Sequence, residues 1–417
     1  MARSAVWHPF TQHGIEPAAT EIARGEGAWL ETPDGRRIFD GISSWWVITH
    51  GHRHPAILAA IRDQLERLDQ VIFAGFTHKP AERLAEKLIA RAPPGLAHVF
   101  YSDSGSTAVE VALKMALGYW RNISAPRTRI AALEHGYHGD TIGTMSAGAR
   151  GVFNAAYEPL LFDVTRIPFP HPGREQETFD ALDAAGRQGG LAALIAEPLI
   201  AGAGGMLMYR PAALAEMKRI CERHGALFIA DEVMTGWGRT GTLFACEQAA
   251  VTPDILCVAK GLTGGSLPLA ATLAIPAIFD AHVSTDRART FFHSSSFTAN
   301  PVCCAAALAN LAIWDAEPVQ ARVAQLGAWQ EKALATLTGP RFENPRRCGT
   351  IAAVDLAVTD EGYLANVGPA LRAHFLARGI LLRPLGNTIY VMPPYCTSEA
   401  DLAMVYDAIR EAPAVAG

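Results

Sequence analysis

Long hydrophobic runs, a basic excess and C-x-x-C cysteine pairs are all missing from this sequence. No apolar stretch among the 417 residues reaches the length of a membrane-spanning helix, and the first ten residues lack the continuous apolar core of a signal peptide. The net charge of −5 offers no positive field for a nucleic acid. The seven cysteines include no C-x-x-C pair and mostly lie in apolar segments, which favours reduced, buried thiols. We therefore expect a cytoplasmic protein with no membrane or nucleic-acid partner.

Lysine is scarce, with six lysines against thirty arginines. Lys260 differs from the others because it follows the apolar run 254–259 and opens a glycine-rich turn over 261–266. Loss of hydration at the end of a buried strand lowers the pKa of an amine and suits it to form a Schiff base. The other five lie in polar, helix-like contexts that predict solvated amines: Lys79, Lys87, Lys114, Lys218 and Lys332.

An acid stands at the end of the preceding buried strand. The segment 228–233 reads Phe-Ile-Ala-Asp-Glu-Val, so Asp231 closes an apolar run. A pyridoxal phosphate enzyme needs this combination, because the acid keeps the pyridine nitrogen protonated and the lysine holds the cofactor aldehyde. A structural ion pair between Asp231 and Lys260 is the alternative that these two segments leave open.

Strand and helix patterns alternate through the middle of the chain, which predicts an α/β fold with a mostly parallel sheet and helices on both faces. Ligands bind such sheets at the carboxyl ends of the strands, where Asp231 and Lys260 fall. The patterns predict strands over 98–101, 129–133, 191–197, 227–231, 255–259 and 269–275, and helices over 106–120, 211–224 and 300–314.

The rest of the chain predicts a smaller α+β domain. Its C-terminal part comprises a second helix after Pro318, strands around 349–356, a helix over 368–378, strands over 380–383 and 389–392, and a helix from Ser398. The first forty residues, with a turn at 32–35, are expected to join it. We expect residues 1–47 to form the N-terminal part of the small domain, 48–310 the large cofactor-binding domain and 311–417 the C-terminal small domain.

Two further strand ends carry polar motifs. Residues 102–107 lie between a strand and a helix, where the free N–H groups of a helix N-terminus can cradle a phosphate, and ordinary helix capping is the alternative. Residues 135–140 follow another strand and include Tyr137, whose ring can stack on a planar cofactor. Neither the histidines of this run nor those at 50, 52 and 54 have the adjacent ligand set of a usual metal site, so we predict no metal.

These motifs resemble those of the class III aminotransferases. The resemblance rests on Glu197-Pro198, on the segment 231–241 and on the segment 259–265, and it extends over nearly the whole chain. It implies fold type I, a pyridoxal phosphate cofactor, and a homodimer with active sites at the subunit interface.

Within this class the chain resembles one group, the adenosylmethionine–8-amino-7-oxononanoate aminotransferases, which make 7,8-diaminononanoate for biotin biosynthesis. This resemblance implies 8-amino-7-oxononanoate as acceptor, S-adenosyl-L-methionine as amino donor, and a ping-pong cycle. The segments that carry it are 7–11, 43–46, 50–52, 100–106, 383–384 and 392–395.

The same resemblance implies a role for each matching residue. The catalytic residues would be Lys260 as the Schiff-base lysine, Asp231 on the pyridine nitrogen and Tyr137 stacked on the ring. Gly105 and Ser106 would bind the phosphate. The cofactor site would be completed by Glu197, Val233, Ser295 and Ser296.

On the substrate side, Arg383 would bind the substrate carboxylate, a bidentate task that suits a guanidinium group. Trp45 and Trp46 would border an apolar substrate chain, and plain core or dimer packing is their alternative. The substrate site would also include Phe10, Tyr137, Lys260 and Ser294.

The chain departs from the pattern of the group at two places, one residue and one three-residue segment. Its best-known members have tyrosine where this chain has Phe10, so the phenol that takes part in substrate recognition is missing. They also have Gly-Pro-Thr where this chain has Ser294-Ser295-Ser296. Ser296 keeps a hydroxyl that can reach the phosphate of the partner subunit, whereas Ser294 adds bulk beside the substrate.

Other functions remain open from the sequence. The donor can be lysine with the same acceptor, or the chain can be another ω-aminotransferase that acts on diamines or β-amino acids. The tryptophan pair and Arg383 speak against the latter. A non-catalytic pyridoxal-binding regulator would be expected to carry a DNA-binding domain or to lack Lys260, and neither holds.

Overall fold

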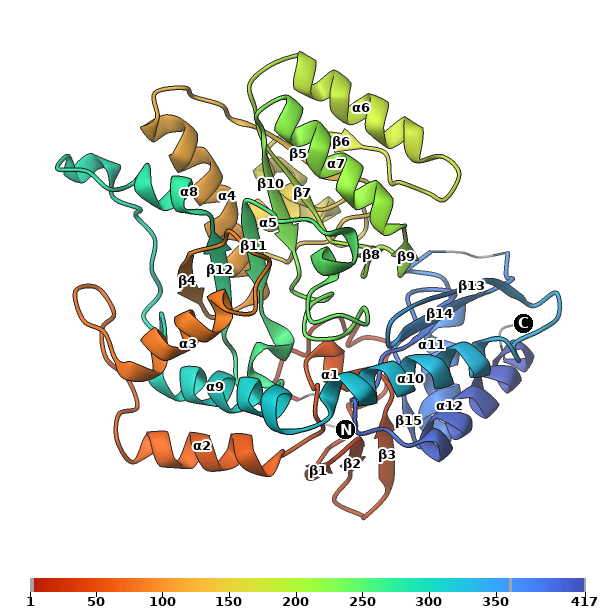
Figure 1. Cartoon of the computed structure of the whole chain (residues 1–417). Helices are drawn as coiled ribbons and strands as arrows, with labels where there is room; N and C mark the ends of the chain where they lie inside the picture. The colour runs from red at the N-terminus through yellow and green to blue at the C-terminus, as the bar shows by residue number, and fades with distance from the viewer. Residues whose placement is uncertain (1–3, 360–361, 416–417) are drawn as a thin grey trace.

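A computed structural model describes residues 4–359 and 362–415. At its centre lies a seven-stranded sheet in the order β4-β12-β11-β10-β7-β5-β6 (Figure 1). Neighbouring strands are parallel, except that β12 runs antiparallel to both β11 and β4. The predicted α/β fold with a mostly parallel sheet is confirmed. The strands are β4 (His98–Ser102), β5 (Arg129–Leu133), β6 (Thr165–Ile167), β7 (Leu191–Ala196), β10 (Leu227–Asp231), β11 (Ile255–Val258) and β12 (Ala270–Ala274).

Helices cover both faces of this sheet. Ile229 packs with α4 (Gly105–Asn122) in one apolar core, whereas its neighbour Phe228 belongs to a second core that includes α7 (Pro211–Arg223). Strands buried on both faces read as continuous apolar runs, which is why the sequence predicted them. The other helices of this region are α2 (Pro55–Leu65), α3 (Lys79–Ile89), α5 (Ile142–Ala147), α6 (Glu175–Arg187), α8 (Pro276–Asp280) and α9 (Pro301–Ala316).

The C-terminal part contains a second, smaller sheet of β13 (Phe342–Cys348), β14 (Ile351–Leu356) and β16 (Thr388–Val391). The chain reaches it through α10 (Val319–Leu334), the second helix predicted after Pro318. The two remaining helices are α11 (Val367–Ala377) and α12 (Glu399–Glu411).

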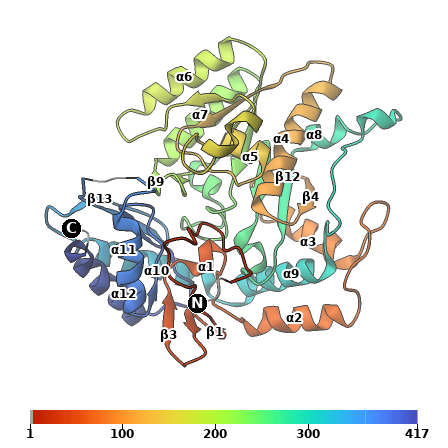
Figure 2. The same ribbon diagram turned by 180° about the vertical axis from the view of Figure 1, so that it is seen from behind.

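The two ends of the chain meet in a third sheet. Its strands are β1 (Arg24–Glu26), β2 (Trp29–Glu31), β3 (Arg37–Asp40) and β15 (Ile380–Leu381). β3 pairs with β15 in parallel, with Asp40 opposite Leu381, and β3 lies beside the C-terminal elements in both views (Figure 1; Figure 2). The predicted strand over 380–383 is shorter than expected, since it ends at Leu381. The domain boundaries stay a prediction.

In the part of the chain that the structure describes, no single helix is long and apolar enough to cross a membrane. The pair α9 and α10 meets that test together by length and composition only, with a bend of 78° between the two helices.

Candidate active site

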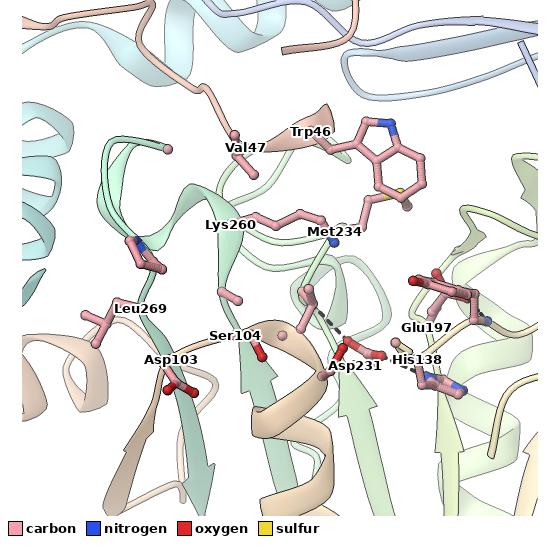
Figure 3. Close-up of a pocket in the computed structure, with 18 of the residues that line it drawn as sticks. Trp46, Val47, Asp103, Ser104, His138, Glu197, Asp231, Met234, Lys260 and Leu269 are labelled. Carbon is pink, nitrogen blue, oxygen red and sulfur yellow. Dashed lines mark hydrogen bonds and ion pairs between the residues drawn. The ribbon is translucent and has the colours of Figure 1, made fainter. Parts of the chain in front are cut away.

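The carboxyl ends of four parallel strands meet at one cavity. Tyr137 follows β5, Glu197 follows β7, Asp231 ends β10 and Lys260 follows β11. Together with the N-terminus of α4 they line a cavity of about 380 Å³ (Figure 3). The two strand-end residues that the sequence singled out, Asp231 and Lys260, are therefore brought to one place.

Lys260 begins a short 3-10 turn with its backbone in the left-handed region, at φ 46°. Its side chain reaches across the cavity, between Trp46 on one side and Asp231 on the other (Figure 3). The amine lies 5.3 Å from the centre of the Trp46 ring. Burial lowers the pKa of Lys260, and the charges of Asp231 and Glu197 oppose that change. A lowered pKa favours the neutral amine, which is the reactive form.

Asp231 pairs with His138 and not with Lys260 among the described residues. The carboxylate atom Oδ2 lies 2.7 Å from His138 Nδ1, and Oδ1 accepts a hydrogen bond of 3.1 Å from the Val233 N–H. Both side chains are buried. The sequence suggested His138 only as a candidate metal ligand, so its position behind the carboxylate was missed. Its place one residue after Tyr137 at a strand end was the available clue.

Glu197 is a buried acid held by backbone groups. Its oxygens accept hydrogen bonds from the N–H groups of Tyr137, at 3.0 Å, and Gly202, at 3.1 Å. Burial raises the pKa of Glu197 to about 7, and the nearby Asp231 charge acts in the same direction. Glu197 thereby fixes the loop that carries Tyr137.

The N-terminus of α4 has both features that the sequence left open, ordinary helix capping and free N–H groups suited to a phosphate. Ser104 caps the helix in a capping box with Thr107. The first N–H groups of a helix have no acceptor within it, and here they border the cavity. A Cβ placed on Gly105 would lie 2.6 Å from Val233 Cγ1, so only glycine leaves this approach open. The hydroxyl of Ser106 accepts a hydrogen bond of 3.3 Å from the Asp140 N–H.

A second cavity of about 270 Å³ adjoins the first and shares three lining residues with it, Trp46, Tyr137 and Lys260. Its other predicted residues are Phe10, Trp45 and Arg383. Asp140, which ends the motif 135–140, also lines this cavity. No sequence motif marked the remaining lining residues, which come from separate loops and strands: Phe153, Ala203, Tyr363, Leu385 and Tyr390.

Arg383 lies over an aromatic surface in this second cavity. Its guanidinium carbon is 5.1 Å from the centre of the Trp45 ring, and Nη2 donates a hydrogen bond of 3.1 Å to the Phe10 carbonyl. The Phe10 ring meets the Trp45 ring edge-on at 5.3 Å between centroids. Trp45 and Phe10 each keep 38% of their surface exposed, so neither is plain core. Trp46 is buried, yet it also lines both cavities.

Ser294, Ser295 and Ser296 do not line either cavity. Ser294 and Ser296 are exposed, and the Ser296 carbonyl accepts a hydrogen bond of 2.6 Å from Gln70 Nε2. Their predicted contacts depend on a partner subunit and stay a prediction.

The histidines named as metal candidates have other partners. His50 contacts Asn310 at 2.8 Å, His52 contacts Asp40 at 2.8 Å and His54 contacts Glu317 at 3.1 Å. Within the described residues, no group of three or more His, Cys, Asp or Glu side chains is arranged to hold a metal ion.

The surroundings of Lys218 and of the cysteines were also predicted from the sequence. Lys218 is not a solvated amine, because it pairs with Asp254 at 2.9 Å with 12% of its side chain exposed. The seven cysteines are all free. Five of them are buried, Cys348 is half-buried and Cys396 is exposed.

The first cavity fits pyridoxal phosphate. The helix N-terminus and the open approach at Gly105 suit a phosphate, the Asp231 carboxylate suits a protonated ring nitrogen, and Lys260 suits an aldehyde. Tyr137 and Val233 both line the space that a planar ring would occupy.

Comparison with known proteins settles the family. The family model described as aminotransferase class III matches residues 10–412. This chain belongs to the class III aminotransferases. Membership of this family and a solved structural neighbour in a PLP-bound form both imply pyridoxal phosphate as the cofactor.

Several relatives of this class III chain carry one name. A protein of Synechococcus elongatus named adenosylmethionine-8-amino-7-oxononanoate aminotransferase is 47% identical over 97% of this chain and 97% of its own length. A protein of the same name from Nitratidesulfovibrio vulgaris is 42% identical over 98% of this chain and 80% of its own length.

Solved structures agree with the fold. The adenosylmethionine-8-amino-7-oxononanoate aminotransferase of Methanocaldococcus jannaschii superimposes with a TM-score of 0.94 at 33% identity, covering 98% of this chain and 97% of that one. An amine transaminase from an uncultivated Pseudomonas species, in its PLP-bound internal aldimine form, gives 0.93 at 33% identity with full coverage of both chains.

Proposed function

We propose that this chain transfers an amino group from S-adenosyl-L-methionine to 8-amino-7-oxononanoate, giving 7,8-diaminononanoate for biotin biosynthesis. The observation that supports this most is the second cavity, in which an arginine and two tryptophans stand beside the lysine. The names of the most similar relatives agree with it.

The cofactor supplies, when bound, an electron sink for the carbon that gains or loses a proton. Lys260 Nζ is the general base and acid that moves this proton, and its lowered pKa favours the neutral form needed to accept it. Asp231 would hold the pyridine nitrogen of the bound cofactor in its protonated state. His138 keeps the Asp231 carboxylate aligned through the 2.7 Å contact.

Substrate recognition falls to the second cavity. Arg383 offers a guanidinium to the carboxylate of 8-amino-7-oxononanoate, and it would exchange its hydrogen bond with the Phe10 carbonyl for that contact. Trp45 and Trp46 pack against the apolar chain of the acceptor. The same rings also attract the sulfonium cation of the donor.

The working unit in this proposal is a homodimer in the cytoplasm. Ser294 and Ser296 are exposed, and none of Ser294 to Ser296 lines a cavity of its own chain, which suits a contact with the cofactor phosphate in the partner subunit. Free cysteines suit a reducing compartment.

The two half-reactions can be tested separately by absorbance. The purified protein with cofactor should be converted to its pyridoxamine form faster by S-adenosyl-L-methionine than by lysine at equal concentration. The pyridoxamine form should then return to the aldehyde form with 8-amino-7-oxononanoate, and mass spectrometry should detect 7,8-diaminononanoate. Faster conversion by lysine would overturn the donor alone. No return with the acceptor would overturn the proposed function and favour a diamine or β-amino acid aminotransferase.

An Arg383→Ala variant tests the role of Arg383 in the acceptor step. A charge-assisted contact is worth about 2–4 kcal/mol when truncated, so kcat/KM for the acceptor should fall roughly thirtyfold or more. Arg383→Lys should recover only part of that loss, because an ammonium group cannot bind bidentately.

A further inference from the structure

The tryptophan pair sits on a left-handed turn built without glycine. Four consecutive residues have positive φ: Ser43 at 53°, Ser44 at 45°, Trp45 at 68° and Trp46 at 75°. The turn closes with a hydrogen bond of 2.8 Å from the Trp46 N–H to the Ile42 carbonyl. Residues with a Cβ are strained in this conformation, so surrounding contacts must hold it.

Asp40 is the main side chain that holds Ser44 in this turn. The carboxylate is completely buried at the end of β3. Its Oδ1 accepts a hydrogen bond of 2.8 Å from the Ser44 N–H, and its Oδ2 accepts one of 2.7 Å from the Ser44 hydroxyl. His52 Nε2 lies 2.8 Å from the same Oδ2 and fixes the carboxylate from the other side.

The turn decides where both indole rings lie. Trp46 comes to rest 5.3 Å from the Lys260 amine, with its indole N–H donating to the Tyr390 hydroxyl at 3.0 Å. Trp45 comes to rest beneath Arg383, at 5.1 Å. The direction of each side chain depends on the backbone conformation of the turn. If Ser44 left the left-handed region, the rings of Trp45 and Trp46 would therefore move away from Arg383 and Lys260.

Asp40 also links the turn to the strand that leads to Arg383. It pairs in register with Leu381 of β15, and the next residue, Gly41, donates a hydrogen bond of 3.1 Å to the Leu381 carbonyl. Arg383 follows two residues later. The positions of Trp45 and Arg383 relative to each other are therefore set through one short piece of paired backbone.

We propose that Asp40 is a positioning residue that holds the left-handed turn 43–46 and thereby sets the acceptor specificity of the site. It touches neither cavity itself. The specificity part of this proposal rests on the proposed function, whereas the conformational part does not.

A rescue experiment tests the proposal. Asp40→Ala should lower kcat/KM for 8-amino-7-oxononanoate on the order of ten- to a hundredfold, mainly through KM, since small misplacements of positioning groups have effects of this size. Glycine adopts positive φ without strain, so Ser44→Gly in the Asp40→Ala background should recover much of the loss. Ser44→Ala in the same background keeps the strained Cβ and should recover nothing. Equal effects of glycine and alanine, or an unchanged KM in Asp40→Ala, would overturn the proposal.

A second readout needs no substrate. The near-ultraviolet circular dichroism of the full chain without cofactor should change in Asp40→Ala and return toward wild type with Ser44→Gly, because the two indoles report the conformation of the turn.

Asp254→Asn is the matched control. Asp254 accepts hydrogen bonds from the Phe228 N–H and the Lys218 amine, but it precedes β11 at the amino end of that strand and lines neither cavity. That variant should lower thermal stability and leave the tryptophan spectrum and the acceptor KM unchanged. If wild type shows no acceptor activity, the proposed function fails, while the spectra still decide whether Asp40 holds the turn.

Discussion

Glu197 illustrates how the fold alters a single side chain. Burial raises its pKa to about 7, from the ordinary glutamate value of 4.5. Between these two pH values the folded protein keeps the proton on Glu197, whereas the unfolded chain has lost it. The stability that this group contributes is therefore fully present below pH 4.5 and is lost as the pH rises through about 7.

Replacing Glu197 by glutamine should remove this pH dependence. Relative to Glu197→Gln, the wild-type free energy of unfolding should fall by roughly 3 kcal/mol between pH 4.5 and pH 7. Urea unfolding of the protein without cofactor at several pH values measures this difference. Glu66→Gln, at an exposed position, serves as the control and should follow wild type. Parallel curves for wild type and Glu197→Gln would show that Glu197 is charged in the folded state.

The sequence predicted those site residues that lie at the ends of apolar strands. Asp231 and Lys260 end apolar strands, and parallel strands bring such ends together. It did not reveal His138 behind Asp231, because that contact joins residues 93 positions apart in the chain. It did not reveal the contact of Asp40 with Ser44 either, because that contact, although it joins residues only 4 positions apart, depends on the geometry of buried side chains. Lys218 was misjudged for a similar reason, since its partner Asp254 lies on another element.

At the scale of elements, α4 carries the phosphate end of the proposed cofactor site. Its amphipathic pattern predicted the helix, and Ser104 fixes where it begins. The left-handed turn 43–46 was beyond prediction, because it contains no glycine and its conformation depends on hydrogen bonds to a completely buried carboxylate, Asp40. Local propensity predicts an element only where it agrees with the tertiary structure.

A Gly105→Ala substitution tests the start of α4. The added methyl group would meet Val233 at 2.6 Å and force apart the helix N-terminus and the strand end that carries Asp231. The affinity for pyridoxal phosphate should fall at least about tenfold, which corresponds to roughly 1.4 kcal/mol. Equilibrium dialysis or cofactor absorbance during dilution measures it.

Ser104→Ala is the matched control at the neighbouring position. Loss of the cap should lower the free energy of unfolding by about 1 kcal/mol and leave the approach at Gly105 open. If both variants bind the cofactor as wild type does, the helix N-terminus is not the phosphate site.

At the scale of the whole molecule, the site forms where distant parts of the chain meet. Phe10 and Trp45 come from the N-terminal region, Lys260 from the central sheet, and Arg383 from the segment after β15. The α/β class was predictable because the buried strands are continuous apolar runs. The pairing of β3 with β15 was not, since two short strands separated by most of the chain carry no mutual pattern.

The proposed chemistry depends most on Lys260 as the residue that holds the cofactor. Borohydride reduction of the cofactor-loaded protein, followed by proteolysis and mass-spectrometric peptide mapping, locates the pyridoxyl group directly. We predict the group on Lys260 and on none of the other five lysines. A pyridoxyl group on another lysine, such as Lys114 or Lys218, or no stable label at all, would contradict the assignment of the cavity and the chemistry built on it.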